Sequence, residues 1–348
     1  MVGESVDAPD RIVDRHARPR GRLPSPGSRA WRRRRAYRAA RDRLIGRTIR
    51  TLRRGMLRFV PLPAALRLAD AVGWLIYVCA IGPRRLASRQ ITEAMPEVPP
   101  ASRRAAVRDM ARGLARSFVE ILYLDQIASP SSSWVDIEGR ELMDEALAEG
   151  RGVIAITGHI GNWELLASWF SLHGYPVSVV ATPVKGEQVN AEIIGLRSQL
   201  GIETVMRDGP GASRRILSAL RRGRILAILM DQDTRGQAVF VPFLGRPART
   251  PVGPAALAFR TGAVLIAAFI HRLPDGRHRI RLSRPELPAI GAGNDQAERD
   301  AWTLRTTAEL TRIIEREVRS RPDEWVWWHR RWRRQPSPST PRVDGRSS

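Results

Sequence analysis

The sequence predicts an α/β protein with a central, mostly parallel or mixed sheet flanked by helices, preceded by helices that associate with a membrane. From Val135 onward, short apolar runs rich in β-branched residues alternate with helical windows, which is typical of strands joined by crossover helices. Before that point, an Arg-dense segment adjoins an uncharged apolar stretch over residues 71–82. The composition, 43% hydrophobic and 27% charged, is that of a globular protein.

The N-terminus is basic and irregular. Residues 1–28 are rich in Pro, Gly, Ser and Arg without apolar periodicity, so we expect a disordered tail, and the start lacks the apolar core of a signal peptide. Residues 1–58 contain 18 arginines and 5 acidic residues, a net +13 of the chain's +23. This concentration indicates a polyanion nearby, such as an anionic membrane surface, although a general coding bias toward Arg explains the excess equally well.

Residues 29–130 are expected to form a helical, membrane-associating region. Pro63 is well placed to open a helix over residues 64–82, whose uncharged run over 71–82 is too short to span a bilayer, since spanning takes about 20 apolar residues. Trp74 and Tyr77, with Arg on both flanks, fit a helix lying at the headgroup level. A buried core helix is the alternative. Residues 84–127 are expected to form a helical pair interrupted at 96–100.

Residues 131–334 are expected to form the catalytic α/β domain, followed by a disordered tail over 335–348. The first part of the domain alternates strands with helices. We expect strands over 152–157, 177–181, 203–206 and 225–229, and helices over 162–173, 187–200 and 211–221. A Gly/Pro-rich stretch over 235–254 follows. After it we expect a helix over 254–261, strands over 263–270 and 278–283, and a helix over 297–319.

The segment around His159 carries the clearest sign of chemistry. His159 follows a buried strand, at the edge where open α/β sheets bind ligands. Gly158 and Gly161 allow the backbone to approach a substrate closely, and Glu164 follows five residues after the histidine. A histidine paired with a carboxylate acts as a general base. Spacing alone leaves open that His159 caps a helix beside an unrelated glutamate.

Metal and covalent chemistry are not indicated. The single cysteine, Cys79, excludes a disulfide framework and any Cys-based zinc or iron–sulfur site. Asp231 and Asp233 follow another strand and are suited to orient an arginine or a sugar hydroxyl, but they are too isolated to indicate magnesium. The sequence contains no G-x-S-x-G elbow, so no acyl-enzyme is expected, and neither is a cofactor.

The segment HIGNWE, from His159 to Glu164, resembles the H-x4-[DE] motif of the glycerolipid acyltransferase superfamily. Three further segments narrow the resemblance to the lipid A biosynthesis acyltransferase family (the lauroyl and myristoyl transferases), over about residues 60–334. They are MDQD at 230–233 with FVPFLG at 240–245 and ARTP at 248–251, FRTGA at 259–263, and RPDEWVWWHRRW at 321–332. The chain departs from the family in its long Arg-rich arm and in lacking a proline in the strand after Gly262.

The resemblance implies transfer of a fatty acyl chain from an acyl-carrier protein or coenzyme A thioester to a hydroxyl of a membrane glycolipid. A lipid A precursor is the first expected acceptor, at the cytoplasmic face of a bacterial inner membrane. A phosphatidylinositol mannoside, a lysophospholipid, a thioesterase activity and non-catalytic binding of anionic lipid are alternatives, and nucleic acid is not expected as a partner.

The resemblance also assigns roles to residues. It makes His159 the base and Glu164 its partner, and it matches Arg197 and Asp233 to the family's characteristic arginine and DQD aspartate. The tetrahedral oxyanion is expected on backbone N–H groups near Gly161 and Asn162, or on Arg197. In the C-terminal segment, we expect some tryptophans to be buried and the arginines to face acceptor phosphates. An apolar groove between the anchor helices and the sheet is expected to hold the acyl chain.

Overall fold

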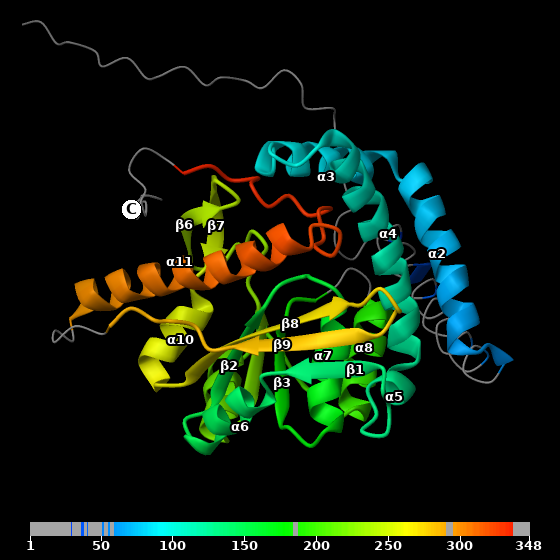
Figure 1. The fold of residues 1–348 in the computed structure, drawn as a ribbon. Coiled ribbons are helices and arrows are strands. Elements are labelled where there is room, and N and C mark those ends of the chain that lie inside the picture. Colours follow the sequence, from blue (N-terminus) through cyan, green and yellow to red (C-terminus); the bar gives the residue numbers. More distant parts are fainter. Residues whose placement is uncertain are drawn as a thin grey trace, which may run out of the picture.

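The computed structural model describes residues 59–183, 187–289 and 295–336, together with a few isolated positions before residue 59 (Figure 1). The expected tail over 1–28, most of the Arg-dense segment over 29–58 and nearly all of the tail over 335–348 lie outside the described residues. The predictions for these segments, and the proposed boundaries between the regions, therefore stay predictions.

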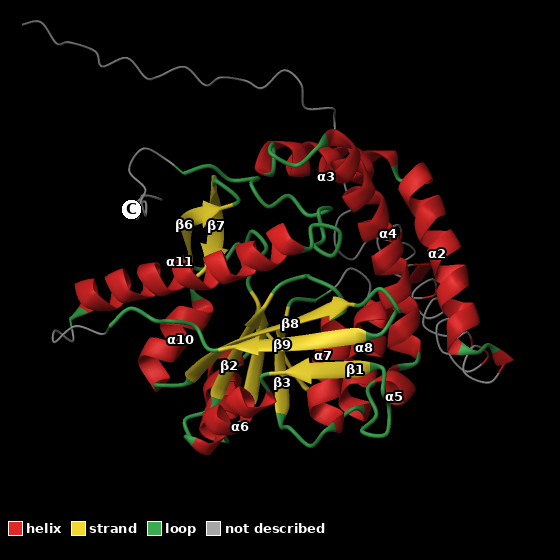
Figure 2. Cartoon of the chain, viewed as in Figure 1, coloured by secondary structure: helices red, strands yellow, loops and turns green. Residues whose placement is uncertain are grey.

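A seven-stranded sheet forms the centre of the molecule, in the order β1-β9-β8-β2-β5-β3-β4 (Figure 2). All neighbouring strands pair in parallel except β8 and β9, which are antiparallel. The fold class predicted from the sequence is thus confirmed. The strands are β1 (Val135–Glu138), β2 (Val153–Thr157), β3 (Val177–Ala181), β4 (Glu203–Met206), β5 (Ile225–Leu229), β8 (Val264–Arg272) and β9 (His278–Ser283).

Helices cover both faces of this sheet. Successive side chains of a strand point to opposite faces, so each central strand contributes to an apolar core on both sides. In β2, Ile154 and Ile156 pack in one apolar cluster with α9 (Ala212–Arg221), α10 (Gly253–Thr261) and α11 (Gln296–Ser320). Val153 and Ala155 of the same strand pack in a second cluster with α6 (Arg140–Ala148) and α7 (Trp163–Leu172). The central strands are therefore apolar throughout, as parallel strands between two helical layers must be.

The predicted strands over 177–181, 203–206, 225–229 and 278–283 have the bounds that the structure gives them, and the other predicted elements agree within a few residues. The segment over 235–254 contains structure that the sequence did not reveal. It folds into an antiparallel hairpin of β6 (Ala238–Phe243) and β7 (Arg246–Pro251). Leu244 and Gly245 both have positive φ, 50° and 72°, as a tight two-residue hairpin turn requires. Three prolines within β6 and β7 argued against strands at the sequence level. The hairpin tolerates them because each strand of a two-stranded ribbon has an edge whose backbone N–H groups need no partner.

The helical region contains α2 (Leu62–Cys79), α3 (Ile81–Ala94), α4 (Pro100–Leu122) and the short α5 (Leu124–Ile127). The helix predicted over 64–82 is therefore interrupted at Ala80, after which α3 turns back to the body. Pro63 stands in the first turn of α2, as predicted. A small-residue face of α2 packs on α4 so closely that a Cβ on Gly73 would lie 2.5 Å from the Cα of Arg112. Arg112 also donates to Asp70 of α2 at 3.2 Å.

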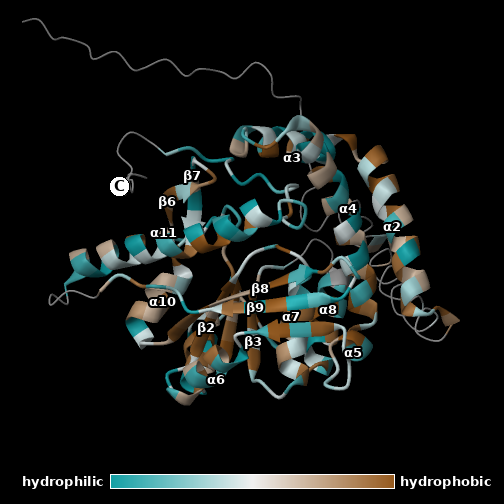
Figure 3. Ribbon diagram, viewed as in Figure 1, coloured by the Kyte–Doolittle hydropathy of each residue, from teal (hydrophilic) through white to brown (hydrophobic). Residues whose placement is uncertain are grey.

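The opposite face of α2 is exposed, and Figure 3 shows apolar residues along the helix. It carries Leu68, Val72, Trp74, Leu75, Ile76 and Val78, with Ile81 at the start of α3. Among the described residues, α2 is the helix long and apolar enough to cross a membrane by length and composition, and only 22% of it is buried. Within the described part of the chain α2 is thus not a buried core helix, and this outer surface, which we call the α2 apolar face, has no covering element there.

Candidate active site

His159 and Asp231 form a hydrogen-bonded pair at the C-terminal edge of the sheet. Nδ1 of His159 lies 2.8 Å from Oδ1 of Asp231, and the backbone N–H of His159 donates to Oδ2 at 2.8 Å. The strand register explains the pairing. Thr157 of β2 stands opposite Leu229 of β5, and each of the two paired residues follows its strand by two positions. Two parallel strands thus deliver a base and a carboxylate to one point, at the edge predicted for a ligand site.

Asp231 is buried and ionised. Burial alone would raise the pKa of this carboxyl, but the charge and hydrogen bonds of His159 outweigh it and hold the pKa well below its usual range. The indole N–H of Trp325 donates to Oδ2 at 2.8 Å. An ionised carboxylate only accepts hydrogen bonds, so in the neutral form of His159 it favours the tautomer with the proton on Nδ1 and the lone pair on Nε2.

The His159 side chain remains accessible, with 24% of it exposed. Trp163, in the first turn of α7, stands edge-on to the imidazole with ring centroids 4.9 Å apart. The ring of His329 lies on another side at 6.4 Å. Burial lowers the pKa of His329 to about 4, with Asp231 opposing the shift, so this second ring is neutral near pH 7 and adds no competing charge. The geometry suits His159 to accept a proton from a hydroxyl through Nε2.

The expectation that Glu164 orients His159 is wrong in this structure. Glu164 instead accepts two hydrogen bonds from Arg197 of α8 (Glu187–Gln199): Nε donates to Oε2 at 2.9 Å and Nη2 donates to Oε1. The reason is local geometry. His159 stands before α7, facing the end of β5, whereas Glu164 is the second residue of α7 and faces α8. The two residues matched to the family motif, Glu164 and Arg197, thus form a pair of their own, and a catalytic role for them stays a prediction.

Gly161 and Asn162 hold the turn between β2 and α7 in place. The N–H of Gly161 donates to the carbonyl of Glu324 at 3.1 Å, so it is not the free oxyanion donor we expected. Asn162 caps α7 by accepting from Leu165 N–H at 3.1 Å, while its Nδ2 donates to Glu120 at 2.9 Å. Both groups shape the turn, and a contact between them and substrate stays a prediction.

Glu120 of α4 ties the helical region to this turn. Arg272 Nη2 donates to Glu120 Oε2 at 3.0 Å, and His278 Nε2 lies 3.1 Å from Oε1. Burial would raise the pKa of Glu120, but these partners outweigh it and lower the pKa to about 2. The buried carboxylate stays ionised at neutral pH, so the α4 helix and the turn after His159 are joined by charge-assisted hydrogen bonds.

The C-terminal segment closes the site from above. Trp325, Trp327 and Trp332 are buried, as expected for some of the tryptophans. Gln90 of α3 fixes the segment's backbone: its Nε2 donates to the carbonyls of Trp327 and His329 at 2.7 and 2.8 Å. Sequence reasoning missed Gln90 and the role of Trp325, because both act through contacts between segments more than 90 residues apart in the chain.

His271 of β8 anchors the same segment. Its Nδ1 lies 2.8 Å from Oε2 of Glu324, and its Nε2 lies 2.7 Å from Oε2 of Glu317 in α11. Burial alone would lower the pKa of His271, but the two glutamates outweigh it and raise the pKa to about 9. The ring is therefore charged at neutral pH and joins the sheet, α11 and the C-terminal segment.

This site predicts a pH-dependent stability. The folded His271 keeps its proton up to about pH 9, whereas an unfolded histidine releases it near about 6.5. The contribution of His271 to the free energy of unfolding is therefore complete below about pH 6.5. It is about 3 kcal/mol at most and is lost as the pH rises through about 9. Urea unfolding at intermediate pH values should show this decline, and His271→Gln should abolish it while His173→Gln keeps it. An equal decline in His271→Gln would contradict the assignment.

Two cavities lie near the site. A cavity of about 310 Å³ separates α4 from the β8–β9 connection and the C-terminal segment, and Gly161 lines it. It occupies the place expected for an apolar acyl groove, but charged side chains line it, among them Asp70, Arg116 and Arg272. The apolar cavity lies instead under α7 beside Glu164 and Arg197, and at about 50 Å³ it is too small for a fatty chain. Neither of these two cavities, both lined by described residues, is the expected apolar groove.

No group of three His, Cys, Asp or Glu side chains suited to a metal occurs among the described residues. The candidate site is thus an imidazole–carboxylate pair at a sheet edge, with a second carboxylate–arginine pair nearby on α7 and α8. Over residues 51–334 the chain matches the family described as bacterial lipid A biosynthesis acyltransferase. The chain belongs to this family. The resemblance stated from the sequence is therefore confirmed.

This member of the lipid A acyltransferase family is similar in sequence to two groups of relatives. A phosphatidylinositol mannoside acyltransferase of Mycobacterium tuberculosis H37Rv is 35% identical over 132 residues, 37% of this chain and 42% of the relative. The lipid A biosynthesis lauroyltransferase of Escherichia coli K12 is 23% identical over 283 residues, 80% of this chain and 88% of the relative. The lipid A biosynthesis palmitoleoyltransferase of the same strain is 25% identical over 205 residues, which are 58% of this chain and 63% of the relative. The chain thus matches less than half of the mycobacterial relative and most of the lauroyltransferase.

Proposed function

We propose that this protein transfers a fatty acyl chain from an acyl-carrier protein or coenzyme A thioester to a hydroxyl of a glycolipid at a membrane surface. The observation that carries the proposal is the accessible His159, held by the buried carboxylate of Asp231 at the ligand-binding edge of the sheet. Family membership supports acyl transfer, and the relatives' names support a glycolipid acceptor. A lipid A precursor is the first acceptor proposed, and a phosphatidylinositol mannoside is the second because of the higher local identity.

In the proposed reaction, Nε2 of His159 takes the proton of the acceptor hydroxyl while Nδ1 keeps its hydrogen bond to Asp231. The oxygen attacks the thioester carbonyl, forming a C–O bond and a tetrahedral oxyanion. Collapse of this intermediate breaks the C–S bond, and the leaving thiolate takes the proton back from His159. Asp231 stays ionised throughout and stabilises the transient imidazolium.

The assay that tests this proposal uses the purified full-length protein, a labelled acyl thioester and three acceptor conditions: a lipid A precursor, a phosphatidylinositol mannoside, and no lipid. Label appearing in either glycolipid supports the proposal and identifies the acceptor. Label appearing as free fatty acid in all three conditions would replace it with a thioesterase. An unconsumed thioester would indicate a non-catalytic binder of lipid. Running both donor types in parallel identifies the carrier.

We further propose that the α2 apolar face rests on the bilayer surface rather than crossing it. Asp70 of α2 is held by Arg112 and Arg116 of α4, so the helix stays attached to the charged body of the protein. Trp74 stands in the exposed stretch, as an interfacial anchor does. At 18 residues, the helix is about 27 Å long, slightly less than the hydrocarbon thickness.

The triple variant Leu68→Ser/Trp74→Ser/Leu75→Ser should bind phosphatidylglycerol vesicles at least about a hundredfold more weakly than the wild type, because each exposed side chain contributes roughly 1.5–3 kcal/mol when buried in lipid. Cosedimentation at high salt screens the contribution of the basic arm. Leu287→Ser removes an exposed leucine outside the α2 apolar face and should bind as the wild type does. Unchanged binding of the triple variant would refute the placement of α2 on the membrane.

A further inference from the structure

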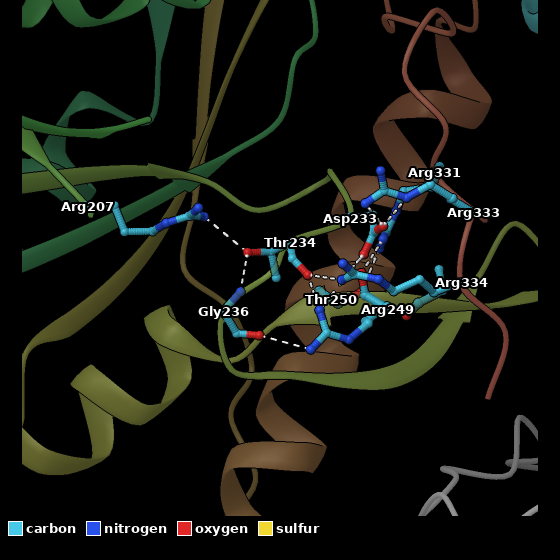
Figure 4. A network of polar contacts seen from close by, with 10 residues as sticks. Arg207, Asp233, Thr234, Gly236, Arg249, Thr250, Arg331, Arg333 and Arg334 are labelled. Carbon is cyan, nitrogen blue, oxygen red and sulfur yellow. Dashed lines mark hydrogen bonds and ion pairs between the residues drawn. The ribbon is translucent and has the colours of Figure 1, made fainter. Parts of the chain in front are cut away.

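Arginines from separate segments gather around Asp233, at the loop that follows β5 (Figure 4). Oδ2 of Asp233 accepts from Nη2 and Nε of Arg333 at 2.9 and 3.2 Å, and Oδ1 accepts from Nη1 of Arg334 at 3.2 Å. Nη1 of Arg249, on β7, lies 3.9 Å from the same Oδ1. Among the described residues, three guanidinium groups thus lie around one carboxylate, an excess of two positive charges.

The inner side of this cluster is held rigidly. Arg249 donates to the carbonyl of Gly236 at 3.0 Å and to that of Thr234. Behind it, the fully buried Arg331 donates from Nη1 to the carbonyl of Arg249 and from Nη2 to Oγ1 of Thr250, both at 2.6 Å. Its Nε, also buried, has no hydrogen-bond partner among the described residues. Burial lowers the pKa of Arg331 to about 10, so it remains charged and adds positive potential. The hairpin and the C-terminal segment are therefore locked together.

The outer side offers unused donors. Side-chain exposure is 49% for Arg333 and 35% for Arg334. Their hydrogen bonds within the described part of the chain use Nε and Nη2 of Arg333 and only Nη1 of Arg334. Because a guanidinium carries five N–H donors, each side chain has further donors for a ligand arriving from solvent.

We propose that Arg333 and Arg334 form a subsite for a phosphate group carried by one of the two substrates, an inference that rests on the proposed acyl transfer. A phosphate monoester has a charge of roughly −1.5 to −2 at neutral pH, which matches the excess of the cluster. Planar arginine forks bind phosphate oxygens in pairs. Within the described part of the chain, the single negative charge of Asp233 balances only one of these arginines.

The position of the cluster relative to His159 supports the same reading. Asp233 lies two residues beyond Asp231, so their Cα atoms are within about 7 Å of each other. The negative charges of Asp231 and Asp233 both act on Arg331, where they oppose the lowering of its pKa by burial. Arg331 therefore lies near both the cluster and the carboxylate that pairs with His159. Arg207 reaches the cluster from the end of β4 by donating to Oγ1 of Thr234 at 3.1 Å. The loop after β5 therefore carries both the partner of His159 and the carboxylate of the arginine cluster.

The test compares Arg333→Gln/Arg334→Gln with Arg312→Gln/Arg316→Gln, a pair on the exposed side of α11 that removes the same charge elsewhere. We expect KM for the phosphate-bearing substrate to rise about tenfold for each arginine lost, with kcat little changed. If the increase appears for acyl-coenzyme A but not for acyl-pantetheine, the donor carries the phosphate. If it appears for a phosphorylated acceptor but not its dephosphorylated form, the acceptor does. Equal KM values in the variant and the control would overturn the proposal.

Direct binding separates this subsite from the proposed reaction. Titration calorimetry of the full-length protein with inorganic phosphate should show binding that weakens at least about tenfold in Arg333→Gln/Arg334→Gln and not in the α11 control. That outcome supports the subsite even if the protein transfers no acyl group. Phosphate binding that is the same in both variants overturns it whatever the activity. Should the double variant not fold, Arg333→Gln alone decides, because its side chain is the more exposed of the two.

Discussion

His159→Ala should reduce acyl transfer by about 10²- to 10⁴-fold, because general-base catalysis by a positioned imidazole contributes that much. Asp231→Asn should come close to the same loss. The carboxylate accepts from Nδ1 and the backbone N–H of His159 and from Trp325, and an amide places an NH2 group against one of these donors. The proton of His159 then moves to Nε2, where it blocks the base. Initial rates with a labelled thioester measure both effects.

Glu164→Gln is the variant that separates Asp231 from the motif carboxylate. Because Glu164 bonds to Arg197 and not to His159, we expect its loss to reduce turnover less than Asp231→Asn does. A greater loss in Glu164→Gln than in Asp231→Asn would mean that the motif partner acts on His159 after all. Thermal unfolding and vesicle binding of all three variants show whether a rate effect reflects folding or membrane association instead.

The pairing of strands in the sheet explains why the sequence identified His159 but not its partner Asp231. A buried apolar run ending in His159 is a local signal, and the strand and the turn were both predicted from it. Asp231 lies 72 residues further along and becomes the partner only because β5 pairs with β2, although β3 and β4 intervene in the chain. A local pattern does not state which strands are neighbours. The motif spacing therefore drew attention to Glu164, the carboxylate nearest in sequence rather than in space.

The same distinction explains the other outcomes. The exposed face of α2 was predicted because composition alone reveals an apolar stretch flanked by arginine. The charged lining of the 310 Å³ cavity was not, because Arg272 and Arg321 reach it from distant segments of the sheet and the C-terminus. The β6–β7 hairpin was not predicted because of its prolines. Proline is compatible with a strand mainly at a sheet edge, and the sequence does not show which strands are at an edge.

Gly161→Ala should destabilise the protein by about 3 kcal/mol or more and reduce turnover further than the loss of folded protein explains. Gly161 has φ of +58°, and a Cβ there would lie 2.1 Å from the carbonyl oxygen of Ile270. Left-handed backbone costs a residue with a side chain about 1–2 kcal/mol, and the overlap forces either β8 or the turn to move. Since the turn carries His159, a displacement of about 1 Å lowers the rate on the order of 10²-fold.

Gly150→Ala is the matched control, because Gly150 has nearly the same backbone conformation, with φ of +70°, but no heavy atom within 4 Å of the added Cβ. It should cost only the backbone term, about 1 kcal/mol, with turnover per folded molecule unchanged. Chemical denaturation and rates normalised to folded protein measure both variants. Equal destabilisation of the two would mean that the contact with Ile270 gives way easily. The turn would then not be the rigid support that the hydrogen bond from Gly161 to Glu324 indicates.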